Sequence, residues 1–132
     1  MKSLISMLTE ATNELSRFLK DIEKNKDFIK FLNDYDYEYT ISEPPTKDEL
    51  IDGLCDYVAY YVYTQFGDKY KYINLSDGTF AHYCIYDPTD KKYKDGVDFN
   101  GKAKWKDLTW YKNSNSPWKG NIEETEEIPE IE

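Results

Sequence analysis

The sequence is poor in the residues that cross-link small folds or bind metals: it has two cysteines and one histidine in 132 residues. Two cysteines cannot build the disulfide framework of small secreted domains. Without a secretory context, Cys55 and Cys84 are predicted to be free thiols in a reducing compartment, although a Cys55–Cys84 disulfide stays open. A metal site made of Cys55, His82 and Cys84 would lack paired ligand spacing and a fourth ligand, so we expect no metal and no cofactor.

Positive charge is also scarce. The chain has 17 Lys and Arg against 26 Asp and Glu, for a formal net charge of −9. Nucleic-acid binding depends on clustered cations, so we expect no nucleic-acid partner. A mimic of nucleic acid is not favoured either, because the acids outside residues 121–132 alternate with lysines. A positively charged protein partner, or simple solubility, fits this balance better.

Long apolar runs are missing. No stretch approaches the roughly 20 apolar residues that a helix needs to cross a bilayer. The start, MKSLISMLTEATNEL, turns polar at Thr9 and Glu10, before an apolar segment of signal-peptide length has formed. We therefore expect no membrane partner and a cytoplasmic protein. Frequent tyrosine, lysine and asparagine hint at an AT-rich genome such as that of a phage, in which case the compartment would be the host cytoplasm.

The chain length predicts one α+β domain over residues 1–120, followed by an acidic tail, 121–132, that we expect to be disordered. Its first part, 1–66, is predicted to be helical except for a loop around Pro44 and Pro45. Helices are expected at 3–24, 26–33, 46–51 and 54–66, with a possible short strand at 37–41. Thr46 and Glu49 form a capping-box pattern, and Gly53 separates the last two helices.

The second part, 70–111, is predicted to form the sheet. Strands are expected at 70–75, at 79–86 and from 92–94 onward, with a last strand or wrap around Trp105 to Tyr111. Ser76-Asp77-Gly78 and Asp87-Pro88-Thr89-Asp90 read as the turns between the first three. The expected fold class is α+β: N-terminal helices and a cysteine-bearing helix packed on an antiparallel sheet of three to five strands.

Cys55 and His82 are the residues that point to chemistry. Cys55 falls in the first turn of a helix, where unpaired backbone N–H groups and the helix dipole favour a thiolate. Alternation along 79–86 places Phe80, His82 and Cys84 on one face. If the sheet packs on that helix end, the imidazole approaches the thiol. Asp95, on the adjacent strand, could hold the imidazole in one tautomer, and Asp98 is the alternative.

This order of residues resembles the papain-like superfamily in its compact NlpC-like and transglutaminase-like forms, including small phage and bacterial members. The matching segments are Gly53-Leu54-Cys55 with Ala59, then Ala81-His82-Tyr83, then Tyr93-Lys94-Asp95-Gly96 or Asp98-Phe99-Asn100-Gly101. The resemblance covers about residues 50–101. It implies that Cys55 is the nucleophile, His82 the general base and Asp95 the orienting residue.

Two functions follow as expectations. The first is a cysteine hydrolase or acyl transferase that acts on an amide, isopeptide or thioester bond of a protein or peptide-like substrate. The second is a non-catalytic acidic binding protein, such as a phage-encoded inhibitor that blocks a host defence protein. Small size, acidity and abundant tyrosine agree with the second but are not specific to it.

Overall fold

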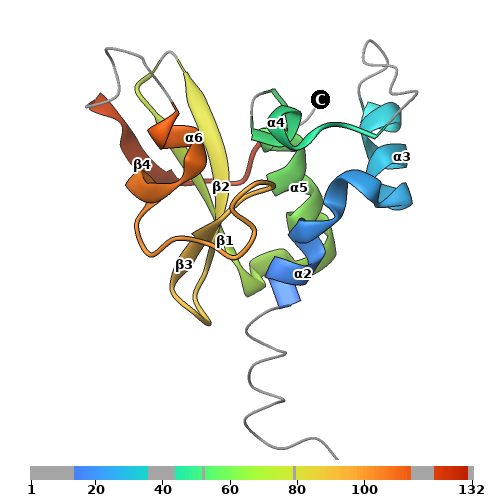
Figure 1. The fold of residues 1–132 in the computed structure, drawn as a ribbon, viewed down its shortest axis with the longest axis horizontal. Helices are drawn as coiled ribbons and strands as arrows, with labels where there is room; N and C mark the ends of the chain where they lie inside the picture. The colour runs from blue at the N-terminus through green and yellow to red at the C-terminus, as the bar shows by residue number, and fades with distance from the viewer. Residues whose placement is uncertain (1–13, 36–43, 52, 79, 114–120, 131–132) are drawn as a thin grey trace, which may run out of the picture.

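The computed structural model describes residues 14–35, 44–51, 53–78, 80–113 and 121–130. It confirms the α+β class, with helices packed on an antiparallel sheet (Figure 1). The helical elements are α2 (Glu14–Lys20), η1 (Ile22–Lys24), α3 (Lys26–Tyr35), α4 (Lys47–Ile51), α5 (Cys55–Phe66), η2 (Gly67–Lys69), η3 (Trp105–Asp107) and α6 (Thr109–Lys112). The strands are β1 (Lys71–Ser76), β2 (Ala81–Asp87), β3 (Lys92–Lys94) and β4 (Glu123–Glu126). The predicted strand at 37–41 and the start of the first predicted helix lie outside the described residues.

Local side-chain hydrogen bonds explain where several helices begin. The Asn25 side chain accepts hydrogen bonds from the backbone N–H of Asp27 (2.9 Å) and of Phe28 (3.1 Å), which starts α3. Thr46 and Glu49 form a reciprocal capping box at α4: Glu49 N–H donates to Thr46 Oγ1 and Thr46 N–H donates to Glu49 Oε1. These contacts confirm the predicted break at Asn25 and the predicted start of α4.

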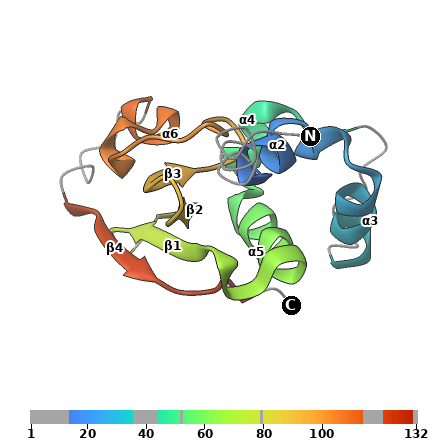
Figure 2. The same ribbon diagram turned by 90° about the horizontal axis from the view of Figure 1, so that it is seen from below.

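Helix α5 lies between the N-terminal helices and the sheet (Figure 2). Its Tyr61 ring packs against Phe18, Phe28 and Phe31, while Tyr63 packs edge-on against Tyr72 of β1. This two-sided burial accounts for a helix so rich in tyrosine, because packing outweighs the mediocre helix propensity of aromatic residues. The buried core here consists of Leu15, Leu19, Ile22, Phe28, Leu32, Leu50, Leu54, Val58, Ala59, Tyr61, Val62, Tyr70, Tyr72 and Ile85.

The described strands form one antiparallel sheet in the order β3-β2-β1-β4. In the β1–β2 hairpin, Leu75 pairs with His82 and Ile73 pairs with Cys84. A second apolar cluster covers the face of the sheet away from α5. It contains Ile73, Leu75, Cys84 and Leu108, with Tyr86, Tyr93, Trp105, Trp110 and Ile122 packed against it.

One buried ionic cluster sits at the β2–β3 hairpin. Lys94 is fully buried, and its Nζ lies 3.0 Å from Asp87 Oδ2 and 2.8 Å from Asp90 Oδ2. Asp87 also accepts a hydrogen bond from the backbone N–H of Thr89. A buried ammonium with two carboxylate partners is a satisfied structural group, so these residues fix the hairpin.

Of the strand or wrap expected around Trp105 to Tyr111, the structure has the wrap: this segment forms the helical turns η3 and α6, and its aromatic rings pack over the sheet rather than extend it. The prediction of a disordered acidic tail is wrong. Residues 123–126 are not disordered but form β4 at the free edge of β1. The main-chain hydrogen bonds of that edge, and the tyrosine hydroxyls that donate to Glu124 and Glu127, offset the repulsion among the acids.

Within the ranges given above, no helix has both the length and the apolar character needed to cross a membrane.

Candidate functional site

Cys55 is the first residue of α5. Its helix N-cap, Leu54, makes no side-chain capping hydrogen bond to the backbone N–H groups that follow it. The side chain is partly exposed, and the structure has it as a free thiol, as it does Cys84. The next residue, Asp56, turns one carboxylate oxygen onto the backbone N–H of Tyr57 at 3.0 Å. Burial raises the pKa of Asp56.

His82 lies on β2 with its side chain fully buried. Its Nε2 is 3.1 Å from Asp95 Oδ2. The indole of Trp110, from α6, stacks on the imidazole with ring centroids 4.5 Å apart and an interplanar angle of 14°. The ring is thus held at its edge by a carboxylate and on one face by an aromatic plane, which fixes its orientation.

Asp95 follows β3 directly and is almost completely buried. While Oδ2 faces His82, Oδ1 accepts hydrogen bonds from the backbone N–H of Val97 (2.9 Å) and of Asp98 (2.7 Å). These two hydrogen bonds within the turn therefore fix the orientation in which the carboxylate pairs with the imidazole. Sequence reasoning chose this residue over Asp98 as the partner of His82, and the structure pairs it with His82.

Asp98 has a different position. Its Oδ2 accepts the backbone N–H of Thr109 at 2.6 Å, and its Oδ1 accepts the Thr109 hydroxyl at 3.1 Å. These bonds tie the start of α6 to the turn that carries Asp95. Asp98 thereby helps to place Trp110, the neighbour of Thr109, over His82.

The turn around Asp95 is also anchored from α4. A Cβ atom placed on Gly96 would lie 2.7 Å from Leu50 Cβ, so the backbone of the turn packs directly on this helix. Lys47 Nζ donates to the Gly96 carbonyl at 2.9 Å and pairs with Glu23 at 2.9 Å. Because α4 precedes α5 with only a short turn between them, the same anchor relates Asp95 to Cys55.

The charges of the three groups are coupled. Burial alone would lower the pKa of His82, but the hydrogen bonds and charges of Asp95 and Cys55 outweigh it and raise the pKa to about 9. Burial would raise the pKa of Asp95, but the hydrogen bond and charge of His82 and the backbone N–H donors lower it. The arrangement therefore favours an imidazolium beside a carboxylate.

The second ring nitrogen of His82 is the one not bound to Asp95. Nε2 is engaged by Asp95, so Nδ1 is the ring nitrogen left for the interaction with Cys55. Nδ1 has no hydrogen bond of ordinary geometry within the described residues. Cys55 therefore raises the pKa of His82 from nearby, without a hydrogen bond of ordinary geometry to Nδ1.

Cys84 is no rival to Cys55. It lies on β2, fully buried, and burial together with the charge of Asp95 raises the pKa of its thiol well above the usual value. A buried, protonated thiol is a poor nucleophile. Among the residues that the structure describes, no group of histidine, cysteine, aspartate or glutamate side chains is placed to hold a metal ion.

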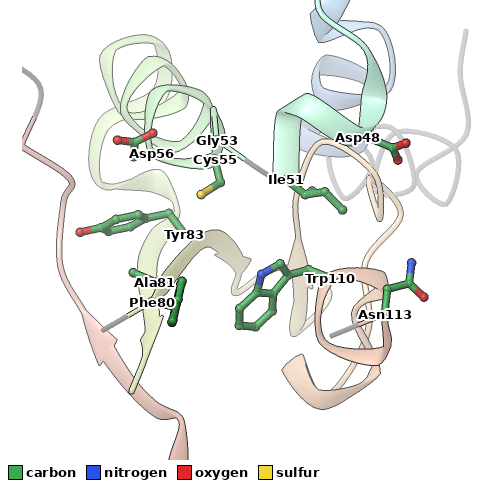
Figure 3. A pocket seen from close by; sticks show the side chains of 10 residues that line it. All are labelled: Asp48, Ile51, Gly53, Cys55, Asp56, Phe80, Ala81, Tyr83, Trp110 and Asn113. Carbon is green, nitrogen blue, oxygen red and sulfur yellow. The ribbon is translucent and has the colours of Figure 1, made fainter. Parts of the chain in front are cut away.

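A pocket of about 750 Å³ opens over Cys55. Figure 3 shows the sulfur directed into it from the start of α5. The lining residues are Asp48, Ile51, Gly53, Cys55, Asp56, Phe80, Ala81, Tyr83, Trp110 and Asn113. The thiol is thus accessible from the pocket, while His82 and Asp95 lie behind it in the protein.

The sequence analysis does not place Trp110 at the site, since it leaves a strand or a wrap open for this segment. The signal that could have located it is weak, because a tryptophan directly after Thr109 does not by itself predict a ring stacked on a histidine. Comparison with profiles of known protein families, with curated protein sequences and with solved structures finds no significant match.

Proposed function

We propose that this protein is a papain-like cysteine hydrolase or acyl transferase that acts on an amide, isopeptide or thioester bond. The observation that supports it is the position of His82. Its Nε2 interacts with Asp95, and its pKa is raised by the pocket-facing Cys55 as well as by Asp95. A nucleophile, a base and a residue that orients the base are the parts that such chemistry needs.

In the proposed reaction, Cys55 transfers its proton to His82 and its sulfur attacks the carbonyl carbon. The C–S bond forms while the carbonyl π electrons move to oxygen, where the backbone N–H of Cys55 at the start of α5 stabilises the negative charge. The C–N, C–O or C–S bond to the leaving group then breaks, and the imidazolium returns its proton to that group. The acyl group remains on Cys55 as a thioester until water or another nucleophile displaces it.

Asp95 supports both proton transfers. Its carboxylate keeps Nε2 protonated, so Nδ1 is the nitrogen that accepts the proton from the thiol, and the charge of Asp95 stabilises the resulting imidazolium. The Trp110 ring covers one face of His82, which keeps water from competing for the hydrogen bond between His82 and Asp95.

The thiol reactivity tests this proposal. Iodoacetamide at pH 7 should label Cys55 faster in the folded protein than in a urea-denatured control, with a pseudo-first-order rate at least about tenfold higher because the ion pair supplies thiolate. His82→Ala should remove most of that difference. Cys84→Ala is the matched control, since this thiol is buried and should contribute no fast phase.

Labelling of Cys55 that is no faster than in the denatured control would contradict the proposal. In that case Cys55 is a structural residue. The second function expected from the sequence, a non-catalytic acidic binding protein, is then the remaining hypothesis. A capture experiment with wild type and Cys55→Ala would then show equal partner binding.

A further inference from the structure

We infer that Trp110 is a further catalytic residue: its indole N–H donates a hydrogen bond to the oxygen that becomes negatively charged when Cys55 attacks a carbonyl group. The inference rests on the proposed function, because it adds a second donor to the same site, beside the backbone N–H of Cys55. Three features support it: the place of the indole in the pocket, the direction of its nitrogen and the contacts that hold the ring.

Trp110 and Cys55 are neighbours of the same imidazole. The indole stacks on one face of His82 with ring centroids 4.5 Å apart, and Cys55 lies near enough to the same ring to raise its pKa. Both side chains also line the pocket. A carbonyl group that enters the pocket and meets the sulfur is therefore next to the indole as well.

The indole nitrogen is turned into the pocket. Figure 3 shows it on the edge of the ring that faces Cys55, with the six-membered ring directed away from the sulfur. An indole has one hydrogen-bond donor and no acceptor, so it can stabilise a negative oxygen but cannot take up the thiol proton. Trp110 therefore complements His82, which accepts that proton, without competing with it.

The ring is held in place by the protein. Its face packs on His82 at an interplanar angle of 14°, and Tyr111 packs beside it with ring centroids 6.3 Å apart. The preceding residue, Thr109, is bound to Asp98 through its backbone N–H at 2.6 Å and its hydroxyl at 3.1 Å. A donor that is already oriented needs no rearrangement when charge develops on the substrate, which is the condition for strong stabilisation of an oxyanion.

Two reactions of Cys55 that differ in the charge they create test this role. In the reaction with p-nitrophenyl acetate the C–S bond forms, the carbonyl oxygen becomes negative, and the C–O bond then breaks to release nitrophenolate. In the reaction with iodoacetamide the sulfur displaces iodide from a saturated carbon, and no tetrahedral oxyanion forms. Both rates are measured on the full-length Cys84→Ala protein, and the same protein with Cys55→Ala gives the background reaction of other groups.

Two replacements at position 110 remove the N–H and retain an aromatic ring. The first is Trp110→Phe. The second is benzothienylalanine, which has sulfur in place of the indole N–H in a ring of similar shape. Each should slow acylation by about tenfold to a hundredfold, which is less than for an enclosed oxyanion donor because the pocket opens to solvent, while alkylation stays within about twofold.

Two further measurements accompany these rates. The NMR titration of the single histidine should be the same with and without the indole N–H, because the change is not expected to act through His82. Trp105→Phe is the matched control: its ring packs edge-on against Tyr111, and its loss should alter neither rate. Thermal unfolding of each variant verifies that the fold is retained.

The outcomes separate this inference from the function on which it rests. Acylation and alkylation that fall together, with a shifted histidine titration, would make Trp110 a positioning residue for His82 and overturn the inference, while the proposed function stands. Unchanged acylation in the benzothienylalanine protein also overturns it. If Cys55 with Trp110 intact reacts with both reagents no faster than in a urea-denatured control, the proposed function is overturned, and the inference with it.

Discussion

At the scale of single residues, the side chain of Asp95 does two things at once. One oxygen closes its own turn through the backbone N–H groups of Val97 and Asp98, and the other meets His82. A carboxylate fixed in this way cannot turn away from the imidazole. The geometry of the pair therefore depends little on whether a substrate is present.

The first prediction concerns this pair. Asp95→Asn keeps an oxygen for the turn but removes the negative charge, so the pKa of His82 should fall from about 9 toward or below its ordinary value. The rate of Cys55 alkylation at pH 7 should drop by about tenfold or more. Because the chain has one histidine, an NMR titration of the imidazole protons reads this pKa without overlap. Asp107→Asn, an exposed substitution, should change neither quantity, and an unaltered titration in Asp95→Asn would contradict the prediction.

Much of the site could be predicted from residue order alone. A cysteine after Gly53 at a helix start, a histidine on the following hairpin and an aspartate after the next turn were expected to approach one another, and the structure brings them together. Their catalytic role stays a prediction. Trp110 and the role of Asp98 could not be foreseen, because stacking and helix anchoring depend on how α6 docks and leave no spacing pattern in the sequence.

At the scale of secondary-structure elements, α4 packs directly on the turn that follows β3. Gly96 has no side chain where α4 passes, and Leu50 fills that space. The contact relates the helix pair that carries Cys55 to the turn that carries Asp95.

The second prediction follows from this contact. Gly96→Ala places a methyl group against Leu50, so the free energy of unfolding should fall by about 1–3 kcal/mol, as for other overpacked positions. Urea denaturation followed by tryptophan fluorescence measures it. Lys104→Ala, at an exposed loop position, should stay within about 0.5 kcal/mol of wild type. Equal stability of Gly96→Ala and wild type would show that the turn does not pack on α4 in this way.

The acidic segment shows why composition misled the prediction of disorder. Its glutamates find partners that only the folded sheet supplies: Glu124 accepts a hydrogen bond from the Tyr93 hydroxyl at 2.6 Å. Glu127 accepts from the Tyr83 hydroxyl at 2.5 Å and from Asn74 Nδ2 at 2.8 Å. Strands and helices of 14–113, by contrast, follow patterns of apolar spacing, caps and turns, and most of them could be predicted.

The third prediction tests these partners. Glu127→Ala leaves the Tyr83 hydroxyl and the Asn74 amide without their acceptor, so the free energy of unfolding should fall by about 1 kcal/mol. Glu126→Ala removes an equal charge from an exposed position of β4 and should be close to neutral. Amide hydrogen exchange of β1 should accelerate in Glu127→Ala if β4 loosens. Equal effects of the two substitutions would mean that the lost negative charge, rather than the lost hydrogen bonds, determines the change in the free energy of unfolding.

For the whole molecule, the buried pair of His82 and Asp95 links stability to pH. The pKa of His82 is raised from 6.5 to about 9, so its contribution to stability is complete below about pH 6.5 and is lost as the pH rises through about 9. The pKa of Asp95 is lowered from 3.8, so its contribution is present above about pH 4 and is lost as the pH falls further. Both contributions are present together in the mildly acidic range.

The fourth prediction is a decline in stability on the alkaline side. Between pH 6.5 and 9, the free energy of unfolding should fall with a slope of at most about 1.4 kcal/mol per pH unit, since one proton is involved. Urea denaturation at a series of pH values measures the slope. His82→Gln should flatten the curve in this range, even if it is less stable throughout. A decline that persists unchanged in that variant would assign it to other groups.

The order of the sheet has a consequence for how the chain folds. β1, β2 and β3 follow one another closely in the sequence, so they can pair through local contacts. In contrast, β4 pairs with β1 across a long sequence separation, with Ser76 opposite Glu123. Bringing such distant segments together has a high entropic cost, which slows the step. The hairpins that carry His82 and Asp95 would therefore form early, and β4 would join them last.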